Sequence, residues 1–190
     1  MQSRLSSIGE IILGHTFRWA IDIVPDGNYQ VLQAKNLKKG GALDMTDLAT
    51  IFLEKTRTQA FVQTGDVLLS NRGIFRSAVY EGDHRNLIAA SSLYIIRIRN
   101  TQKVLPHYLA VYLNSSIGQS ALESMNLGTL IKSLTKRSLI ELSVPLPPIA
   151  TQQTIIDIHR NYETRAALYE RKSSLEQIIA TQTIASLLSH

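Results

Sequence analysis

Basic side chains occur at three places along the chain beside residues that favour turns. The first pair precedes a Gly-Gly turn, the second flanks the segment after Gly65-Asp66, and the third group follows Gly128-Thr129. Lysine neutralises a phosphate as a point charge, whereas arginine can also donate two hydrogen bonds to O6 and N7 of guanine. The pattern predicts DNA contacts by Lys38, Lys39, Arg72, Arg76, Lys132, Lys136 and Arg137, with Arg72 and Arg76 favoured for reading bases. The alternative for each of them is an ordinary solvated surface charge.

The sequence contains few residue patterns that are typical of enzymes. Pro25-Asp26 followed by Gln33-Ala34-Lys35 is similar to a nuclease pattern of two acids and a lysine at a metal site. A glutamine in place of the second carboxylate weakens magnesium binding, and Pro-Asp-Gly-Asn is a strong turn sequence. The phosphate-binding, dinucleotide-binding, serine-hydrolase and Asn-Pro-Pro-Tyr-like methyltransferase motifs are missing. With no cysteine and five scattered histidines, we predict no metal site and no catalysis by this chain.

The elements that would position the basic loops indicate an α+β body. Apolar residues at 5, 8, 11 and 12 have helical spacing up to Gly14, so we expect an opening helix. Short runs rich in Val, Ile, Tyr and Leu predict strands at 29–33, 60–63, 67–70, 78–80 and 93–99. In the last run, we expect one face to be buried and the arginines to be wet. From Pro106 to Leu122 the spacing predicts helices with a cap at Asn114-Ser115-Ser116, so we expect a mixed sheet with helices packed on one side.

The end of the chain reads as one long helix that starts just after Pro145, Pro147 and Pro148. At 1.5 Å per residue it would span roughly 60 Å, more than the body can cover, so it needs a partner. We expect that partner to be a second copy in an antiparallel coiled coil. A hairpin near Lys172-Ser173-Ser174 is the alternative. The residues expected on the pairing stripe are Ile155, Ile158, Tyr162, Tyr169, Leu175 and Ile179.

The formal net charge of +5 lies wholly on the body. Residues 1–150 carry 16 Lys and Arg against 11 Asp and Glu, whereas residues 151–190 carry four of each. A localised positive field suits a domain that meets phosphates, although the same charge also suits an ordinary surface. No run of 18 apolar residues and no apolar leader region is seen at the start. We therefore expect a cytoplasmic protein without a membrane partner.

Several segments follow one another in a recognisable order. They are Tyr29 to Gly41, Phe61 to Gly73 with its Gly-Asp-apolar-apolar core, Ala89 to Arg99, Pro106 to Ser115, Gly128-Thr129, and Leu139 to Pro148 followed by Gln152-Gln153. The ordered set resembles the specificity subunit of type I restriction-modification systems, from about Leu5 to the C-terminus. Members usually carry two recognition domains and two helical regions, whereas this chain is long enough for one of each. The chain is thus expected to be a natural half-subunit or a fragment.

The resemblance implies a DNA target recognition domain at residues 1–148 and a spacer and dimerisation helix at 149–190. In that family the recognition domain reads one half of a split double-stranded DNA site, and the helices dock the methyltransferase subunits. A homodimer would read an interrupted palindrome. Methyl transfer and cleavage would belong to the partner methyltransferase and restriction subunits, with S-adenosylmethionine bound there. The alternatives are a protein-interaction module and a fragment of a two-domain specificity subunit without DNA binding of its own.

Overall fold

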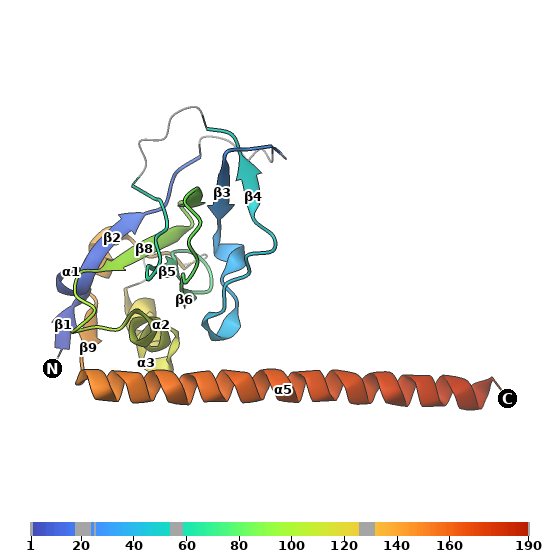
Figure 1. Ribbon diagram of the computed structural model, residues 1–190. Helices are drawn as coiled ribbons and strands as arrows, with labels where there is room; N and C mark the ends of the chain where they lie inside the picture. The colour runs from blue at the N-terminus through green and yellow to red at the C-terminus, as the bar shows by residue number, and fades with distance from the viewer. Residues whose placement is uncertain (1, 18–23, 25, 54–58, 126–131, 190) are drawn as a thin grey trace.

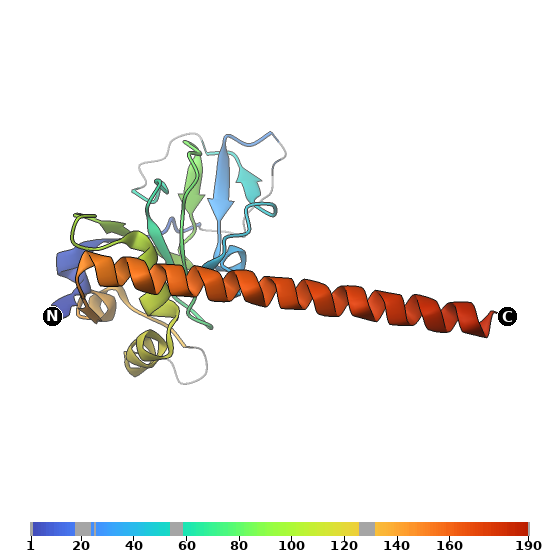
Figure 2. The same ribbon diagram turned by 60° about the horizontal axis from the view of Figure 1, so that its bottom comes forward.

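A body of short strands and helices carries one long helix that projects from it (Figure 1). The computed structural model describes residues 2–17, 24, 26–53, 59–125 and 132–189. Both views show the final helix running past the body on one side and continuing well beyond it (Figure 2). Among the described residues, no helix combines the length and the apolar character that crossing a membrane requires.

The centre of the body is an antiparallel sheet with strand order β2-β8-β5-β6. Its strands are β2 (Gly9–Leu13), β8 (Leu93–Ile98), β5 (Val67–Ser70) and β6 (Ser77–Val79). The register places Ile11 opposite Ile96 and Leu68 opposite Ile95. Alternate residues of β5 and β8 point into two different apolar clusters, because a strand sends successive side chains to opposite faces. The sheet is therefore covered on both sides.

A second, mixed sheet flanks the first, in the order β4-β3-β7. It consists of β4 (Ala49–Ile51), β3 (Tyr29–Leu32) and β7 (Leu87–Ala89), with β3 and β7 parallel. Two 3₁₀ turns follow β3, η1 (Ala34–Asn36) and η2 (Lys39–Gly41). Gly40 and Gly41 both have positive φ, at 79° and 85°, a region that favours glycine. These turns carry the first predicted basic pair.

The helices of the body lie on one side of the central sheet. Beside α2 (Pro106–Asn114) are α3 (Ser116–Ser124), α4 (Lys136–Ile140) and the short α1 (Leu5–Ile8). Ser115 caps α3 by accepting a hydrogen bond from the backbone of Gly118 at 3.1 Å, so the predicted cap between two helices is confirmed. A two-stranded sheet of β1 (Gln2–Arg4) and β9 (Ser143–Pro145) closes the body next to the long helix.

The final helix α5 (Ile149–Leu188) is continuous over 40 residues, so the hairpin alternative is excluded. Pro148 is its N-cap residue, as expected from a proline that cannot lie inside a helix. Only Gln152 and Ile156 are fully buried along its length. The helix is therefore attached to the body along its N-terminal part, and most of its residues beyond that part are exposed.

Three local expectations were wrong. The opening helix ends at Ile8, and residues 9–13 form β2, because Ile11 and Ile12 are used by pairing with β8. Residues 60–63 form no strand and contribute one isolated bridge, from Phe61 to Ile88. Strand β8 is buried on both faces from Leu93 to Ile96, since apolar clusters cover both sides of its sheet. The α+β class and the mixed sheet content are confirmed.

Candidate nucleic-acid interface

Four of the predicted basic residues come together at the hairpin between β5 and β6. Arg72 pairs with Ser133 in an antiparallel bridge, and the backbone N–H of Gly73 donates to the carbonyl of Lys132 at 2.9 Å. The backbone N–H of Leu134 donates in turn to the carbonyl of Asn71 at 2.9 Å. The segment after Lys132 is thus fastened along the hairpin. We name the resulting group the hairpin patch, and its members are Arg72, Lys132, Lys136 and Arg137.

The side chains of the hairpin patch are all exposed. Lys136 and Arg137 lie in the first turn of α4, which Thr135 caps by accepting from the backbone of Ser138 at 3.1 Å. Lys132 forms an ion pair with Glu123 on α3, and both side chains are about half exposed. Arg72, Lys136 and Arg137 have no acidic partner among the ion pairs of the described residues. The patch therefore offers free cationic groups on a backbone that is fixed by hydrogen bonds.

Tyr94 on β8 holds the segment that carries Lys132, Lys136 and Arg137. Its hydroxyl donates to the carbonyl of Leu134 at 3.1 Å from the buried face of β8. Burial raises the pKa of the Tyr94 phenol, and a hydrogen bond with the backbone of Lys136 and the positive charge of Arg72 oppose that rise. The phenol thus stays neutral and serves as a donor that holds the segment carrying the basic residues.

The other three predicted basic residues belong to a second group around η2. Lys38 pairs with Asp44 at 3.1 Å, and its backbone N–H donates to the carbonyl of Ala42 at 2.9 Å. Arg76 is half-buried and donates from Nη1 to the carbonyl of Leu37 at 3.1 Å. Its guanidinium therefore braces the turn, and this contact occupies part of the fork that base reading would use. Lys39 is exposed and enters no ion pair among the described residues.

The η2 turn also touches α5. The ring nitrogen Nε2 of His159 lies 3.2 Å from the carbonyl oxygen of Gly40. A Cβ placed on Gly40 would lie 2.2 Å from Oε2 of Glu163, and the φ of 79° at Gly40 itself favours glycine. The turn that carries Lys38 and Lys39 is seated on the long helix, a contact that the sequence did not indicate.

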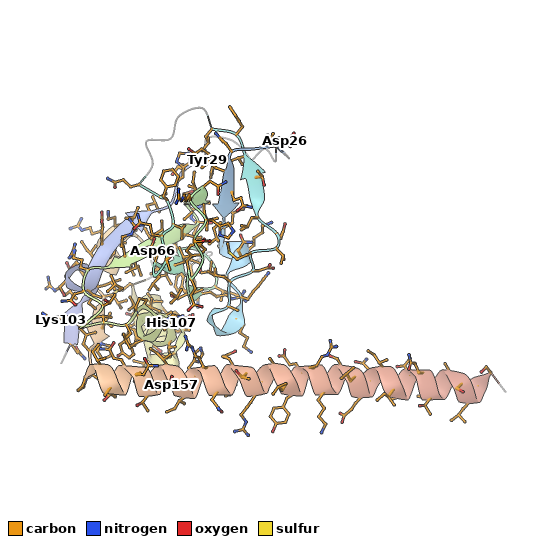
Figure 3. The ribbon with its side chains drawn as sticks, viewed as in Figure 1. Asp26, Tyr29, Asp66, Lys103, His107 and Asp157 are labelled. Atoms are coloured by element: carbon orange, nitrogen blue, oxygen red, sulfur yellow. The ribbon has the colours of Figure 1, made fainter. Side chains whose placement is uncertain are left out.

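The crevice between η2, α2 and α5 is lined by three of the five histidines. His84 Nδ1 lies 2.7 Å from the hydroxyl of Tyr80, His107 Nε2 lies 3.1 Å from Glu81, and His159 contacts Gly40. Each of these rings has a partner within the chain. His107 lies above the helix, whereas Asp26 of the nuclease-like pattern lies at the far end of the body (Figure 3). Lys35 of that pattern pairs with Asp47 at 2.8 Å.

Metal binding finds no support in the part of the chain that the structure describes. No group of three or more His, Asp or Glu side chains there could hold an ion. Gly128 and Thr129, which introduce the third basic group in the sequence, lie outside the described residues. The described residues of this surface present positive charge on the hairpin patch and on the η2 turn.

Two further residues were not among the predicted site residues, Ile74 in this hairpin and Gln152 at the start of α5. Ile74 is 69% exposed in the same hairpin as Arg72, where an apolar side chain is suited to contact a thymine methyl group. The sequence signal for an exposed turn at Ile74 was the glycine before it, Gly73, which has a positive φ in the structure. Gln152 is fully buried at the start of α5, and the signal was a glutamine one turn after the prolines.

The predicted pairing residues of α5 divide into two sets. Ile155 is partly buried and packs against the core of the body. The side chains of Ile158, Tyr162, Tyr169 and Ile179 are more than 60% exposed, and Leu175 is 44% exposed. Ile158, Tyr162 and Tyr169 line one shallow surface groove on the helix. These five exposed residues are named the helix stripe, and Ile155 is assigned to attachment within the chain.

Comparison with known proteins gives a consistent family. A family model described as the type I restriction modification DNA specificity domain matches residues 1–177. The chain is 22% identical over 157 residues to the type I restriction enzyme EcoKI specificity subunit of Escherichia coli (strain K12), which covers 80% of this chain. It spans 34% of that curated relative.

Solved structures share the fold. The type I restriction-modification S subunit from M. genitalium has a TM-score of 0.59 at 15% identity, covering 87% of this chain and 39% of that one. The HsdS subunit from Thermoanaerobacter tengcongensis has a TM-score of 0.60 at 18% identity, covering 90% of this chain and 39% of that one. The chain thus corresponds to less than half the length of each of these proteins.

Proposed function

Because the chain belongs to the family of type I restriction modification DNA specificity domains, we propose that it reads one half of a split double-stranded DNA site. In this proposal the body, residues 1–148, is the target recognition domain, and the helix sets the distance to the second half-site. The observation that carries it is the hairpin patch, in which the Arg72–Ser133 bridge gathers exposed basic side chains from two distant segments.

The hairpin patch is suited to meet the DNA backbone. Arg72, Lys136 and Arg137 are exposed and lack acidic partners among the described ion pairs, so their charge is available to phosphate. Arg72 is the member we assign to base reading, with Ile74 beside it for apolar contact. Lys39 supplies a further phosphate contact from η2, and Lys38 contributes when its pair with Asp44 opens. Arg76 contributes indirectly, because its hydrogen bond to the carbonyl of Leu37 holds the η2 turn that carries Lys38 and Lys39.

The helix stripe is the surface that we assign to assembly. Exposed tyrosine and isoleucine side chains on a helix that leaves the body are suited to an antiparallel coiled coil with a second copy. Two-fold symmetry of that homodimer would be mirrored in an interrupted palindrome. Methyltransferase subunits would dock on the same helices and bind S-adenosylmethionine, and the restriction subunits would cleave. This chain would be a non-catalytic, cytoplasmic subunit.

The salt dependence of DNA binding tests the recognition role. The full chain is titrated with random-sequence duplex DNA at increasing salt, and the logarithm of the association constant should fall linearly with the logarithm of salt concentration. Selection from a randomised duplex library should then enrich two half-sites separated by a fixed spacer. A chain that shows no salt-sensitive binding, alone or with methyltransferase subunits, would instead be an interaction module that uses its exposed helix.

A further inference from the structure

A buried glutamine joins the body to the long helix. Gln152 is fully buried, although glutamine is a residue that is mostly exposed in proteins. Its Oε1 accepts from the backbone N–H of Leu105 at 2.9 Å. Its Nε2 donates to the carbonyls of Lys103 and Pro147, each at 2.9 Å. One side chain on α5 therefore holds the loop after β8, the start of α2 and the proline linker.

The side-chain amide of Gln152 is a buried polar group whose hydrogen bonds are costly to lose. Leu105 is the N-cap residue of α2, and this cap has no hydrogen bond from a side chain of its own helix. Its N–H is satisfied by Gln152. Because the Gln152 amide is fully buried, an orientation that left its oxygen or nitrogen without a partner would destabilise the fold, so the direction of the amide is strongly determined. The first turn of α5 is thus fixed in direction relative to α2.

The apolar contacts of α5 with the body are less directional than the hydrogen bonds of Gln152. Ile156 is buried and Ile155 packs beside it, but apolar burial alone has no preferred orientation. From α2, the hydroxyls of Tyr108 and Tyr112 donate to the carbonyls of Pro145 and Ser143, at 2.5 and 3.1 Å. These bonds hold the linker before the helix. Gln152 extends this hydrogen bonding onto the first turn of α5, and His159, two turns further along, adds one contact from its Nε2 to the carbonyl oxygen of Gly40 at 3.2 Å.

We propose that Gln152 is a positioning residue that sets the angle between the recognition body and the spacer helix, and with it the half-site spacing. The lever is long. About 54 Å of helix follow Gln152 at 1.5 Å per residue, so a tilt of about 5° moves the far end by roughly 5 Å. DNA rises about 3.4 Å per base pair, so that movement exceeds one base pair. The spacing part of this inference depends on the proposed function, whereas the angle does not.

The angle is measured in the full chain by electron spin resonance distances. The chain has no cysteine, so Asp83→Cys on the body and Gln177→Cys on α5, which lies outside the helix stripe, place two spin labels at exposed sites. Labelled chain is diluted with excess unlabelled chain so that only distances within one molecule contribute. We expect one narrow distance distribution. Gln152→Met, which keeps the volume but removes all three hydrogen bonds, should broaden it at least twofold.

The neighbouring glutamine provides the matched control. Gln153 is exposed and donates a hydrogen bond to Asp157 on its own helix, so Gln153→Met should leave the distribution unchanged. Gln152→Glu keeps the acceptor for Leu105 but turns its second oxygen towards the carbonyls of Lys103 and Pro147, so it should also broaden the distribution and covers the case in which Gln152→Met does not fold. A folded Gln152→Met chain, or a Gln152→Glu chain in its place, with the narrow distribution of the parent would overturn the proposal.

DNA selection tests the effect of Gln152 on half-site spacing separately from its effect on the helix angle. Parent and Gln153→Met chains should enrich half-sites at one spacing, and Gln152→Met should enrich the same half-site sequences over two or more spacings. If the parent enriches no split site, the proposed function fails while the distance result still decides the angle. If the parent enriches a split site and Gln152→Met keeps its single spacing, the spacing role of Gln152 is wrong.

Discussion

Arg97 holds the carboxylate of Asp66 with two nitrogens, Nε at 2.9 Å from Oδ1 and Nη2 at 2.8 Å from Oδ2. Asp66 is 1% exposed, and its Oδ2 also accepts from the backbone of Gln63 at 2.7 Å. The same Nη2 donates to the carbonyl of Phe61 at 2.9 Å. The hydrogen bond to Asp66 is the main cause that raises the pKa of Arg97. Asp66 of the Gly65-Asp66 pair therefore has a structural role, because its contacts connect the segment before β5 to Arg97 on β8.

Removing one partner of this pair should destabilise the fold strongly. Asp66→Ala leaves the Arg97 guanidinium partly buried without its counter-ion, and breaking a buried pair in this way costs about 3–5 kcal/mol. Urea denaturation should show a lower midpoint at an unchanged slope. The control is Asp47→Ala, which removes an exposed pair with Lys35 and should cost less than about 1 kcal/mol. Equal losses in the two variants would contradict the structural role of Asp66.

The η2 region should lose stability in acid. Hydrogen bonds from the side chain and backbone of Thr46, and the ammonium of Lys38, lower the pKa of Asp44 from 3.8 to about 2. A carboxylate with a lowered folded pKa contributes stability above its unfolded pKa and loses it as the pH falls through the folded value. The contribution should thus be complete above about pH 4 and disappear towards pH 2.

Asp44→Asn tests that window. The difference in unfolding free energy between the parent and this variant should be constant at neutral pH and shrink as the pH falls from about 4 to about 2. Titration of the Asp44 carboxyl by nuclear magnetic resonance gives the folded pKa directly. An Asp44 that titrates near 3.8 would show that the contacts with Thr46 and Lys38 are not formed in solution.

Local signals predicted the elements that depend on neighbouring residues. The prolines before α5 and the Ser115 cap act within a few residues, and both boundaries are confirmed. Strand β2 was missed because its apolar residues fit a helical period as well, and its strand state depends on pairing with β8, more than 80 residues away. The parallel pairing of β3 with β7 is likewise set by contacts distant in sequence.

The candidate site likewise has features that the sequence predicted and features that depend on the fold. The basic residue types and their turns were visible in the sequence, but the bridge from Arg72 to Ser133 was not, because it joins segments that only the fold brings together. Arg76 looked equivalent to Arg72, yet its guanidinium is turned to the carbonyl of Leu37. Burial of Gln152 could not be separated from exposure of Gln153 without knowing the phase of the helix.

DNA binding should respond to the hairpin patch and not to basic residues on the distal part of α5. Lys136→Ala combined with Arg137→Ala should weaken binding to all duplexes and reduce the salt slope by up to about 0.9 for each phosphate that is no longer neutralised. Arg171→Ala, on the distal part of α5, serves as the control and should leave the slope unchanged. Arg72→Lys keeps the charge but removes the bidentate fork, so the slope should stay while discrimination among sequences falls. An unchanged slope in the double variant would place the interface elsewhere.

Self-association should depend on the helix stripe. Tyr169→Glu and Ile179→Glu introduce charges at side chains that are 64% and 62% exposed in the single chain. Burying an unpaired carboxylate in a coiled-coil seam is costly, so either change should shift a dimer to monomer in light scattering. Gln177→Glu adds the same charge at an exposed residue outside the stripe and should leave the dimer intact. These substitutions are preferable to truncation at Ala150, which would remove Gln152 and Ile156 from the core of the body. A parent chain that is monomeric on its own would mean that the stripe serves another partner, and the interrupted palindrome would have to be withdrawn.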